Sequence, residues 1–375
     1  MHARTVLGLL LAAATALAPQ AGASQSAAPY KIGMTFPLTG PLASVSTEYI
    51  PGAQLAAEDI NRHGGVKGHP IQIVVEDTQS TPQGGVAAMR KLVEVDGVQA
   101  IITIYTNVVT AQMPLADQLK VPTLSNILTP GLVSRSQFSF VHQATMESVS
   151  PVLERFWRAH HVKRVYGIFS DNAFGQQFSP LARATAERAG AEFGVGFLDL
   201  TVSDYRGVAV RAKEFNPDAF FIAAQGGQAE TTAIRQLREL GLTAPMYNAA
   251  VFYQERSWRE AVGAYSEGMY FAGVAVPDGT AHAFIAGYRA KTGFNPDYNA
   301  AQEYDIVKLY ADAIAKSSYN GQAIRNVLAT STGVPSVFGG TIAMGPDHYT
   351  VTSSVGLWQV RKGQLVAVEG GSARR

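Results

Sequence analysis

Short hydrophobic runs alternate with helix-like segments along the start of the chain. Residues 31–36 form an apolar run, residues 53–61 carry apolar side chains at helical spacing, and residues 71–75 form a second apolar run. Strand, helix and strand in this order make a βαβ unit, which predicts a parallel sheet. Because parallel sheets bind ligands beyond the carboxyl ends of their strands, we expect the loop at 37–47 to face a ligand.

The alternation continues to about residue 143 and then starts again. Two further apolar runs in the first array, 98–104 and 121–124, end in polar loops. The strands expected in the second array are 165–169, 193–197, 219–223 and 246–247. After them come an expected strand at 268–275, helices at 281–291, 300–317 and 322–329, and closing strands near 338–342 and 354–360. The pattern therefore predicts an α/β protein with two βα arrays of similar size.

The first residues have the pattern of a secretory signal peptide. His2 and Arg4 precede an apolar stretch at 6–18, and small residues at 21–23 follow it as a cleavage site. We expect cleavage after Ala23 and export of the mature chain. No later stretch has the roughly 18 consecutive apolar residues that a membrane-spanning helix needs, so we expect no membrane span in the mature chain.

Composition and motifs exclude several classes of function. The 375 residues carry a net charge of +1, which provides no basic surface for nucleic acid. The chain has no cysteine, so disulfides, thiolate metal sites and cysteine nucleophiles are excluded. It has no nucleophile elbow, zinc-binding helix motif or phosphate-binding loop. His160 and His161 are adjacent, so their side chains diverge and do not easily share a metal. We therefore expect no enzyme, no metal and no cofactor.

An ordered series of motifs near the start of the chain resembles a known family. The motifs are FPLTGP at 36–41, GAQLAAEDIN at 52–61, GGVKG at 64–68 and ED at 76–77. Together they resemble the branched-chain amino-acid-binding (Leu/Ile/Val-binding-like) family of periplasmic binding proteins, the extracytoplasmic receptors of ABC importers. The agreement continues to about Lys362 and so covers nearly all of the mature chain.

The resemblance implies the type I periplasmic binding fold. This fold has two Rossmann-like lobes, each a mostly parallel sheet flanked by helices, joined by a three-segment hinge. Mapped onto this chain, residues 1–23 are the signal peptide, 30–143 plus 276–340 the N-terminal lobe, and 144–275 plus 341–368 the C-terminal lobe. The hinge segments are expected near 143–146, 274–277 and 339–344. The implied protein is a periplasmic monomer that delivers a small carboxylate-bearing ligand to an ABC permease and, through it, to a cytoplasmic ATPase.

Candidate ligand-binding residues follow the expected strands. Thr106 and Asn107 lie between a strand and a helix, and Thr129 follows the next strand, so their side chains meet at one edge of the sheet. Hydroxyls and a helix N-terminus suit an anionic ligand, although the same residues commonly cap helices. In the resembled family, hydroxyls at the positions of Thr106 and Thr129 hold the ligand carboxylate, and a backbone group at the position of Ile127 assists.

The second array and the last helices supply further candidates. Phe174 stands where many members of the resembled family place a tyrosine over the ligand, although an aromatic in a loop is as often a packing residue. Gln225 and Gly226 end the strand at 219–223. Tyr304 is the remaining aromatic candidate, and core packing is its competing role. Ala250 is expected in the loop that faces the ligand from the second lobe.

Ala250 is also the main departure from the resembled family. Amino-acid binders of the family carry an acid at this position, which accepts the ligand's α-ammonium, and an ammonium buried without an anion is unfavourable. Two alternatives remain: Glu255 or Glu303 replaces the acid, or the ligand lacks an ammonium, as an aromatic or aliphatic carboxylate or an amide does. The second leads us to expect that a keto acid binds more tightly than leucine. A sensory module for an amide or organic acid is the alternative function.

Overall fold

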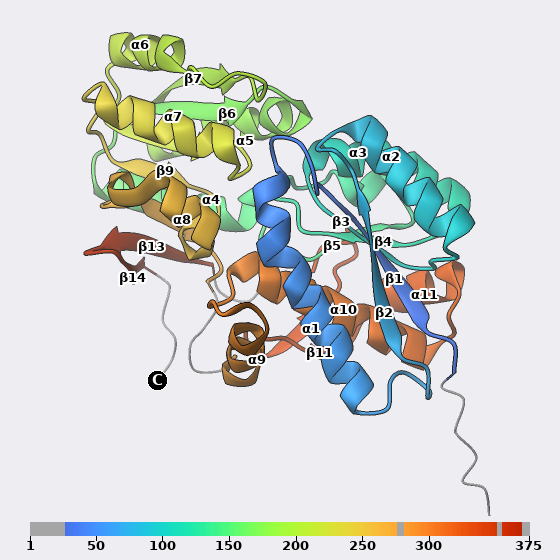
Figure 1. Cartoon of the computed structure of the whole chain (residues 1–375). Helices are drawn as coiled ribbons and strands as arrows, with labels where there is room; N and C mark the ends of the chain where they lie inside the picture. Colours follow the sequence, from blue (N-terminus) through green and yellow to red (C-terminus); the bar gives the residue numbers. More distant parts are fainter. Residues whose placement is uncertain (1–26, 276–280, 351–354, 370–375) are drawn as a thin grey trace, which may run out of the picture.

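Strand pairing divides the chain into two α/β lobes that lie side by side in the computed structural model (Figure 1). The structure describes residues 27–275, 281–350 and 355–369. The predicted signal peptide lies outside the described residues. Among the helices of the described residues, none combines the length and the hydrophobicity needed to cross a membrane.

The first lobe is built on a five-stranded parallel sheet with the strand order β2-β1-β3-β4-β5. Its strands are β1 (Tyr30–Phe36), β2 (Ile71–Asp77), β3 (Ile101–Thr103), β4 (Thr123–Ser125) and β5 (Ser139–Val141). Its helices are α1 (Ser46–Arg62), α2 (Pro82–Arg90), α3 (Thr106–Leu119), α9 (His282–Thr292), α10 (Tyr298–Lys316) and α11 (Gly321–Leu328). Helices α1, α10 and α11 share one hydrophobic core with the sheet, and α2 and α3 share another.

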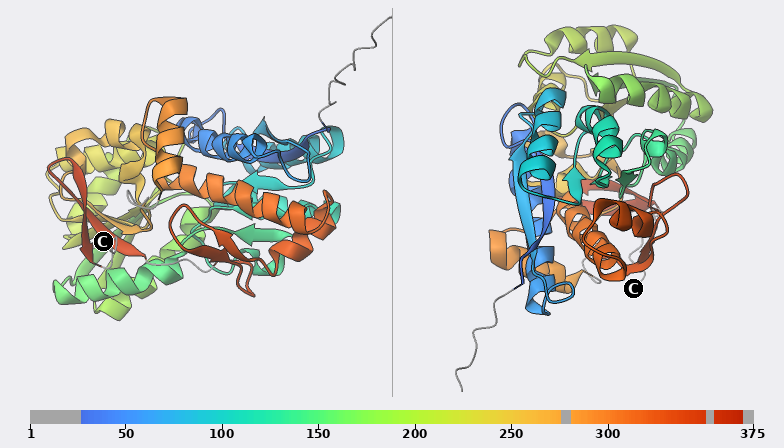
Figure 2. Two further views of the ribbon diagram at one scale, coloured as in Figure 1. Left: turned by 90° about the horizontal axis from the view of Figure 1, so that it is seen from below. Right: turned by 90° about the vertical axis from the view of Figure 1, so that its right-hand side faces the viewer.

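Close packing of α1 against α10 brings the late part of the chain back to the first lobe, as Figures 1 and 2 show. Gly52 makes this approach possible, because a Cβ added there would lie 2.1 Å from the carbonyl oxygen of Ala300. The side chain of Asp297 caps the start of α10 by accepting a hydrogen bond from the backbone N–H of Ala300. These two features fix the position of the first turn of α10, which contributes to the site described below.

The second lobe repeats this architecture and extends it. Its sheet has the order β14-β13-β10-β9-β8-β6-β7, in which the five strands β7-β6-β8-β9-β10 are parallel and repeat the order of the first lobe. The strands are β6 (Arg164–Ser170), β7 (Glu192–Leu198), β8 (Ala219–Ala223), β9 (Met246–Asn248), β10 (Tyr270–Gly273), β13 (Gly356–Arg361) and β14 (Gln364–Glu369), of which the last two pair antiparallel. The helices are α4 (Met146–Ala159), α5 (Ala173–Ala189), α6 (Arg206–Phe215), α7 (Gln228–Glu239) and α8 (Arg256–Val262).

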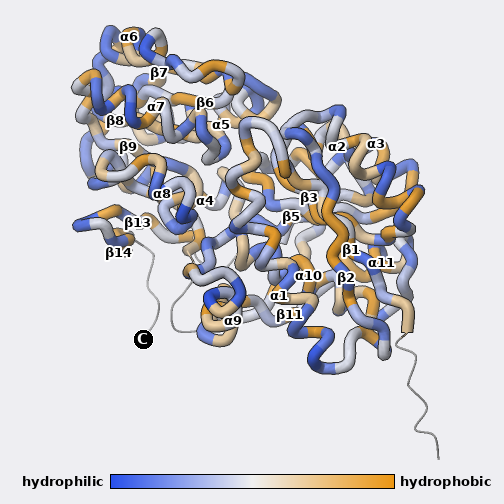
Figure 3. Tube along the Cα trace, in the orientation of Figure 1, coloured by the Kyte–Doolittle hydropathy of each residue, from blue (hydrophilic) through white to orange (hydrophobic). Residues whose placement is uncertain are grey.

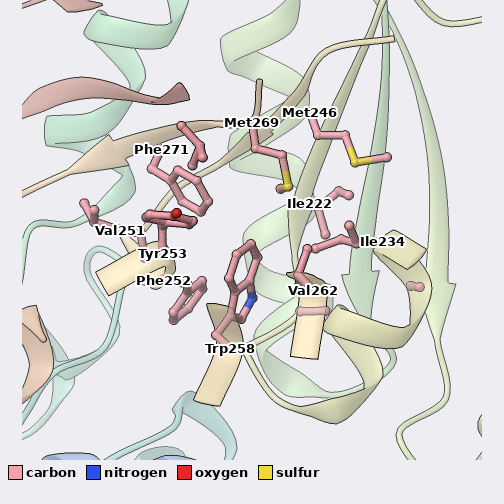
Figure 4. Close-up of a cluster of buried hydrophobic side chains, with 14 of the residues drawn as sticks. Ile222, Ile234, Met246, Val251, Phe252, Tyr253, Trp258, Val262, Met269 and Phe271 are labelled. Carbon is pink, nitrogen blue, oxygen red and sulfur yellow. The ribbon is translucent and has the colours of Figure 1, made fainter. Parts of the chain in front are cut away.

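Helices cover both faces of this second sheet. On one face, side chains from β8, β9 and β10 pack against α7 and α8, and Trp258 stands among them (Figure 4). On the other face, α4 and α5 cover the aromatic side chains of Phe169 and Phe221.

The hydropathy of the chain agrees with two lobes that each have a buried sheet. In the first lobe, for example, β1 is a largely hydrophobic segment in the interior (Figure 3). The predicted fold class is therefore confirmed.

The structure corrects the position of the third hinge segment. We expected it near 339–344, but β12 (Thr341–Ala343) pairs with β11 (Thr332–Pro335), and Ile342 is buried in the core of the first lobe. Tyr349 also pairs with Val141 next to β5, so residues 341–350 lie with the first lobe. The chain joins the second sheet only at β13. The strands β5, β11 and β14 were not among the strands expected from the sequence.

Candidate functional site

A narrow cavity of about 50 Å³ lies between the two lobes. It opens at the carboxyl ends of both parallel sheets, where ligands of such sheets bind. The lining residues come from the ends of β3, β4, β5, β8 and β9, from the starts of α3, α5 and α10, from α1, and from the short 3-10 helix Phe252–Gln254. They are Tyr49, Ile104, Tyr105, Thr106, Asn126, Ile127, Leu128, Gln143, Phe174, Ala223, Gln225, Asn248, Phe252, Tyr298 and Asn299. No lysine, arginine or histidine is among these lining residues.

Two threonine hydroxyls meet at the first-lobe side of the cavity. Thr106 is the first residue of α3 and is buried, and its Oγ1 lies 3.2 Å from Oγ1 of Thr129. The first N–H groups of α3 have no side-chain cap. A helix N-terminus of this kind carries partial positive charge and unpaired donors. The arrangement therefore offers several donors to an anionic group, such as a carboxylate.

Backbone strain marks both sides of the cavity. Tyr105 in the first lobe has φ +69°, and Gln225 in the second has φ +68°. Left-handed backbone at residues other than glycine is unfavourable and concentrates at binding sites. The Oε1 atom of Gln225 accepts a 2.7 Å hydrogen bond from Nδ2 of Asn172. The side chain of Gln225 is thus held by a neighbouring side chain of the same lobe.

Aromatic rings form the second-lobe side of the cavity. Phe174 is buried and stacks on Phe178 with the ring centroids 4.8 Å apart. Phe252 lines the cavity nearby and fills the space beside Gly226, where a Cβ would come within 2.9 Å of the ring. An apolar group of a ligand would be buried against these rings.

Two buried glutamates stand directly behind the polar wall. Glu255 and Glu303 have no exposed surface. Burial raises the pKa of both carboxyls well above the ordinary value, and the nearby Asp297 raises the pKa of each further. Each uses only Oε1 in hydrogen bonds: Glu255 to Tyr49 and Asn299, and Glu303 to Asn126. Their Oε2 atoms are buried without a partner.

The structure places four of the nine predicted residues in the wall of the cavity: Thr106, Ile127, Phe174 and Gln225. Thr129 lies next to them through its contact with Thr106. The others lie outside the lining: Asn107 is half-buried on α3, and the backbone N–H of Gly226 donates to Glu230. Ala250 packs in the core and donates its N–H to Asn248, and the hydroxyl of Tyr304 donates to Asp59.

The loop at 37–47 does not line the cavity, contrary to our expectation. It lies instead against the second lobe, where the backbone of Pro41 and the side chain of Leu42 pack on Gly227. Sequence reasoning also missed Tyr49, Tyr298 and Asn299. Tyr105 and Asn126 could have been found, since both follow predicted strands. Among the described residues, no cluster of three or more His, Cys, Asp or Glu side chains is placed to hold a metal ion.

Comparison with known proteins agrees with this architecture. The family model described as periplasmic binding protein matches residues 29–364. The Leu/Ile/Val-binding protein BraC3 of Rhizobium johnstonii is 24% identical over 374 residues, covering 95% of this chain and 98% of its own length. The isoleucine complex of the substrate-binding protein LivJ from Streptococcus pneumoniae has a TM-score of 0.79 at 22% identity, covering 91% of this chain and 99% of that one. A solute-binding protein of R. palustris in complex with benzoate has a TM-score of 0.80 at 16% identity, covering 91% and 96%.

Two similar α/β lobes with a cavity between their sheets define a two-lobed ligand-binding protein. The chain belongs to the periplasmic binding protein family, of type I and of the branched-chain amino-acid-binding group. Its relatives are binding proteins, so the prediction that the chain is no enzyme is confirmed.

Proposed function

We propose that the protein captures a small carboxylate-bearing ligand between its lobes and delivers it to an ABC permease. The observation that carries this proposal is the pair of hydroxyls of Thr106 and Thr129 at the uncapped start of α3, facing aromatic rings from the other lobe. A carboxylate would lie against the donors, and an apolar group would lie against Phe174 and Phe252. Relatives that bind isoleucine and benzoate have ligands of this shape.

Substitution of the hydroxyls tests the proposal. Thr106→Ala and Thr129→Ala are each expected to weaken ligand binding by about 1–3 kcal/mol, the range for a hydrogen bond to a charged group. A thermal-shift screen of amino, keto and aromatic acids identifies the ligand, and isothermal titration calorimetry measures its affinity. Thr47→Ala is the control, since Thr47 is exposed and its hydroxyl bonds only to Ser44. Unchanged affinity in both variants would place the carboxylate site elsewhere.

We also propose that the chain is exported to the periplasm with its signal peptide removed. The support is the charged, apolar and small-residue order of the first 23 residues. Protein recovered from the periplasm is expected to begin at Ser24 when its N-terminus is sequenced. Recovery from the cytoplasm with Met1 retained would contradict the export of the chain.

A further inference from the structure

A carboxyl group of the second lobe is buried against the first lobe. Glu255 directly precedes α8 and has no exposed surface. Its Oε1 atom accepts hydrogen bonds from the hydroxyl of Tyr49 on α1 and from Nδ2 of Asn299 on α10, the latter at 3.1 Å. Both donors belong to the first lobe, so separation of the lobes would remove both bonds.

The two donors to this carboxyl are uncharged, and its second oxygen, Oε2, is buried without a partner. The guanidinium of Arg256, the next residue, is directed elsewhere: it lies 4.1 Å from the ring centroid of Phe294 and forms an ion pair with Glu260. A carboxylate buried without a cation is unfavourable, whereas the protonated acid is neutral. Because Oε1 accepts both hydrogen bonds, Oε2 is the oxygen that can carry a proton.

Neighbouring acids also oppose a negative charge on Glu255. Burial raises the pKa of Glu255 well above its ordinary value, and the carboxyls of Asp297, Glu48 and Glu230 raise it further, against the hydrogen bond from Tyr49. Asp297 and Glu48 belong to the first lobe, so contact between the lobes brings two of these acids to Glu255. Three tyrosines of the first lobe also lie near this carboxyl, and burial raises the pKa of each hydroxyl well above its ordinary value; they are Tyr49, Tyr105 and Tyr298.

We propose that contact between the lobes takes up one proton from solvent at Glu255, so that the protein binds its ligand more tightly at acidic pH than at neutral pH. This inference rests on the proposed function, since it concerns the regulation of the same ligand capture. Glu255 is not among the residues that line the cavity, so it acts on the contact between the lobes and not on the ligand.

The direction of the pH dependence follows from the two states of Glu255. When the lobes separate, the carboxyl loses its buried environment, its pKa returns toward the ordinary value of a glutamate, and the proton returns to solvent. The raised pKa belongs to the state in which the lobes are in contact. Affinity is therefore highest below the ordinary pKa of a glutamate, and it falls with rising pH until the raised pKa is passed.

Glu255→Gln tests the proposal, because glutamine is uncharged at every pH and keeps an oxygen for Tyr49 and Asn299. Leucine, 4-methyl-2-oxopentanoate and benzoate are titrated by calorimetry from about pH 5.5 to about pH 7.5, where their carboxylates stay ionised. Over this range the affinity of the unmodified protein is expected to fall about tenfold or more, and that of Glu255→Gln by less than about threefold. Glu260→Gln is the matched control, since Glu260 is an exposed acid of α8, and it is expected to keep the pH dependence of the unmodified protein.

Proton uptake is also measured directly. Calorimetry at neutral pH in phosphate and in Tris gives different apparent enthalpies when binding takes up protons from the buffer. The unmodified protein is expected to take up about one proton more than Glu255→Gln for each ligand bound. Small-angle X-ray scattering adds a measurement without ligand: the radius of gyration is expected to be larger at about pH 7.5 than at about pH 5.5 in the unmodified protein, and equal at both in Glu255→Gln.

The outcomes separate this inference from the proposed function. If a probe binds with the same pH dependence in the unmodified protein and in Glu255→Gln, the inference is wrong and the proposed function stands. If Glu255→Gln loses affinity at every pH, the carboxylate contributes to binding in its charged form, and the inference is again wrong. If no probe binds, the proposed function fails for these ligands and scattering decides: a radius that does not change with pH overturns the inference, and a change that Glu255→Gln abolishes supports it.

Discussion

The two lobes share a strand order but contribute different chemistry to the cavity between them. In the first lobe, the strand ends present hydroxyls and amides, at Thr106 and Asn126. In the second lobe, the corresponding edge presents the rings of Phe174 and Phe252 together with the amides of Gln225 and Asn248. The common topology decides where a ligand can bind, whereas the residues at the strand ends decide what kind of group binds.

Two buried glutamates, Glu230 of the second lobe and Glu303 of the first, differ in the number of hydrogen bonds that they accept. Glu230 in the second lobe accepts four hydrogen bonds, from the backbone N–H groups of Ala224 and Gly226 and from the side chains of Asn248 and Trp258. Burial still raises its pKa, although these bonds oppose the shift. Glu303 in the first lobe accepts one, and its second oxygen has no partner. Glu230 therefore stabilises the fold through four hydrogen bonds, whereas Glu303 stabilises it through one.

Removing each acid should show this difference in stability, and the largest effect is expected at Glu230. Glu230→Met leaves four buried donors without an acceptor, and at about 1–3 kcal/mol for each the free energy of unfolding should fall by at least about 4 kcal/mol. Glu303→Met removes one bond, and Asn126 keeps its bond to Asn299, so a loss of about 1 kcal/mol is expected. Urea unfolding followed by circular dichroism measures both.

The matched control for Glu230→Met is Glu239→Met, because Glu239 is exposed at the end of the same helix, α7. A change within about 0.5 kcal/mol is expected for this surface position. Equal losses of stability in the Glu230 and Glu303 variants would remove the distinction between the two acids.

The sequence predicted the sheets better than it predicted the site. Strand ends follow directly from periodicity, which is why Thr106 was found, whereas Ile127 was named only because of the resemblance to the family. Tyr298 and Asn299 reach the cavity only because α10 returns to the first lobe and packs on Gly52. That contact joins parts of the chain far apart in sequence, and no local pattern encodes it.

The acids show a second limit of prediction from sequence. Glu230, Glu255 and Glu303 all lie in or beside helical segments, and nothing local distinguishes them. Their roles depend on which donors surround each carboxyl after folding. The raised pKa of Glu255 likewise comes from burial between the lobes, where it meets Tyr49 and Asn299 of the first lobe.

A further contact between the lobes is expected to contribute less than the hydrogen bonds of Glu230. Glu48 on α1 accepts hydrogen bonds of 2.7 Å from the backbone N–H groups of Arg256 and Ser257 at the start of α8. A first-lobe carboxylate therefore caps a second-lobe helix. Carboxylates at this position stabilise a helix start through its unpaired N–H groups and its partial positive charge. Because the bonds cross between lobes, they stabilise the arrangement in which the lobes are in contact.

Glu48→Gln is expected to weaken ligand binding by about 0.5–2 kcal/mol, the usual value of a helix cap. Glutamine keeps one acceptor but turns an amide N–H toward the second backbone donor. If ligand binds only while the lobes are in contact, a smaller population of that arrangement lowers the apparent affinity in proportion. Calorimetry with the cognate ligand measures the loss.

Glu58→Ala is the control, since Glu58 lies on the same helix and forms an exposed ion pair with Lys291 of α9. Such exposed ion pairs contribute little to stability. An equal loss of affinity in both variants would show that the charge of α1, and not the cap between the lobes, is responsible.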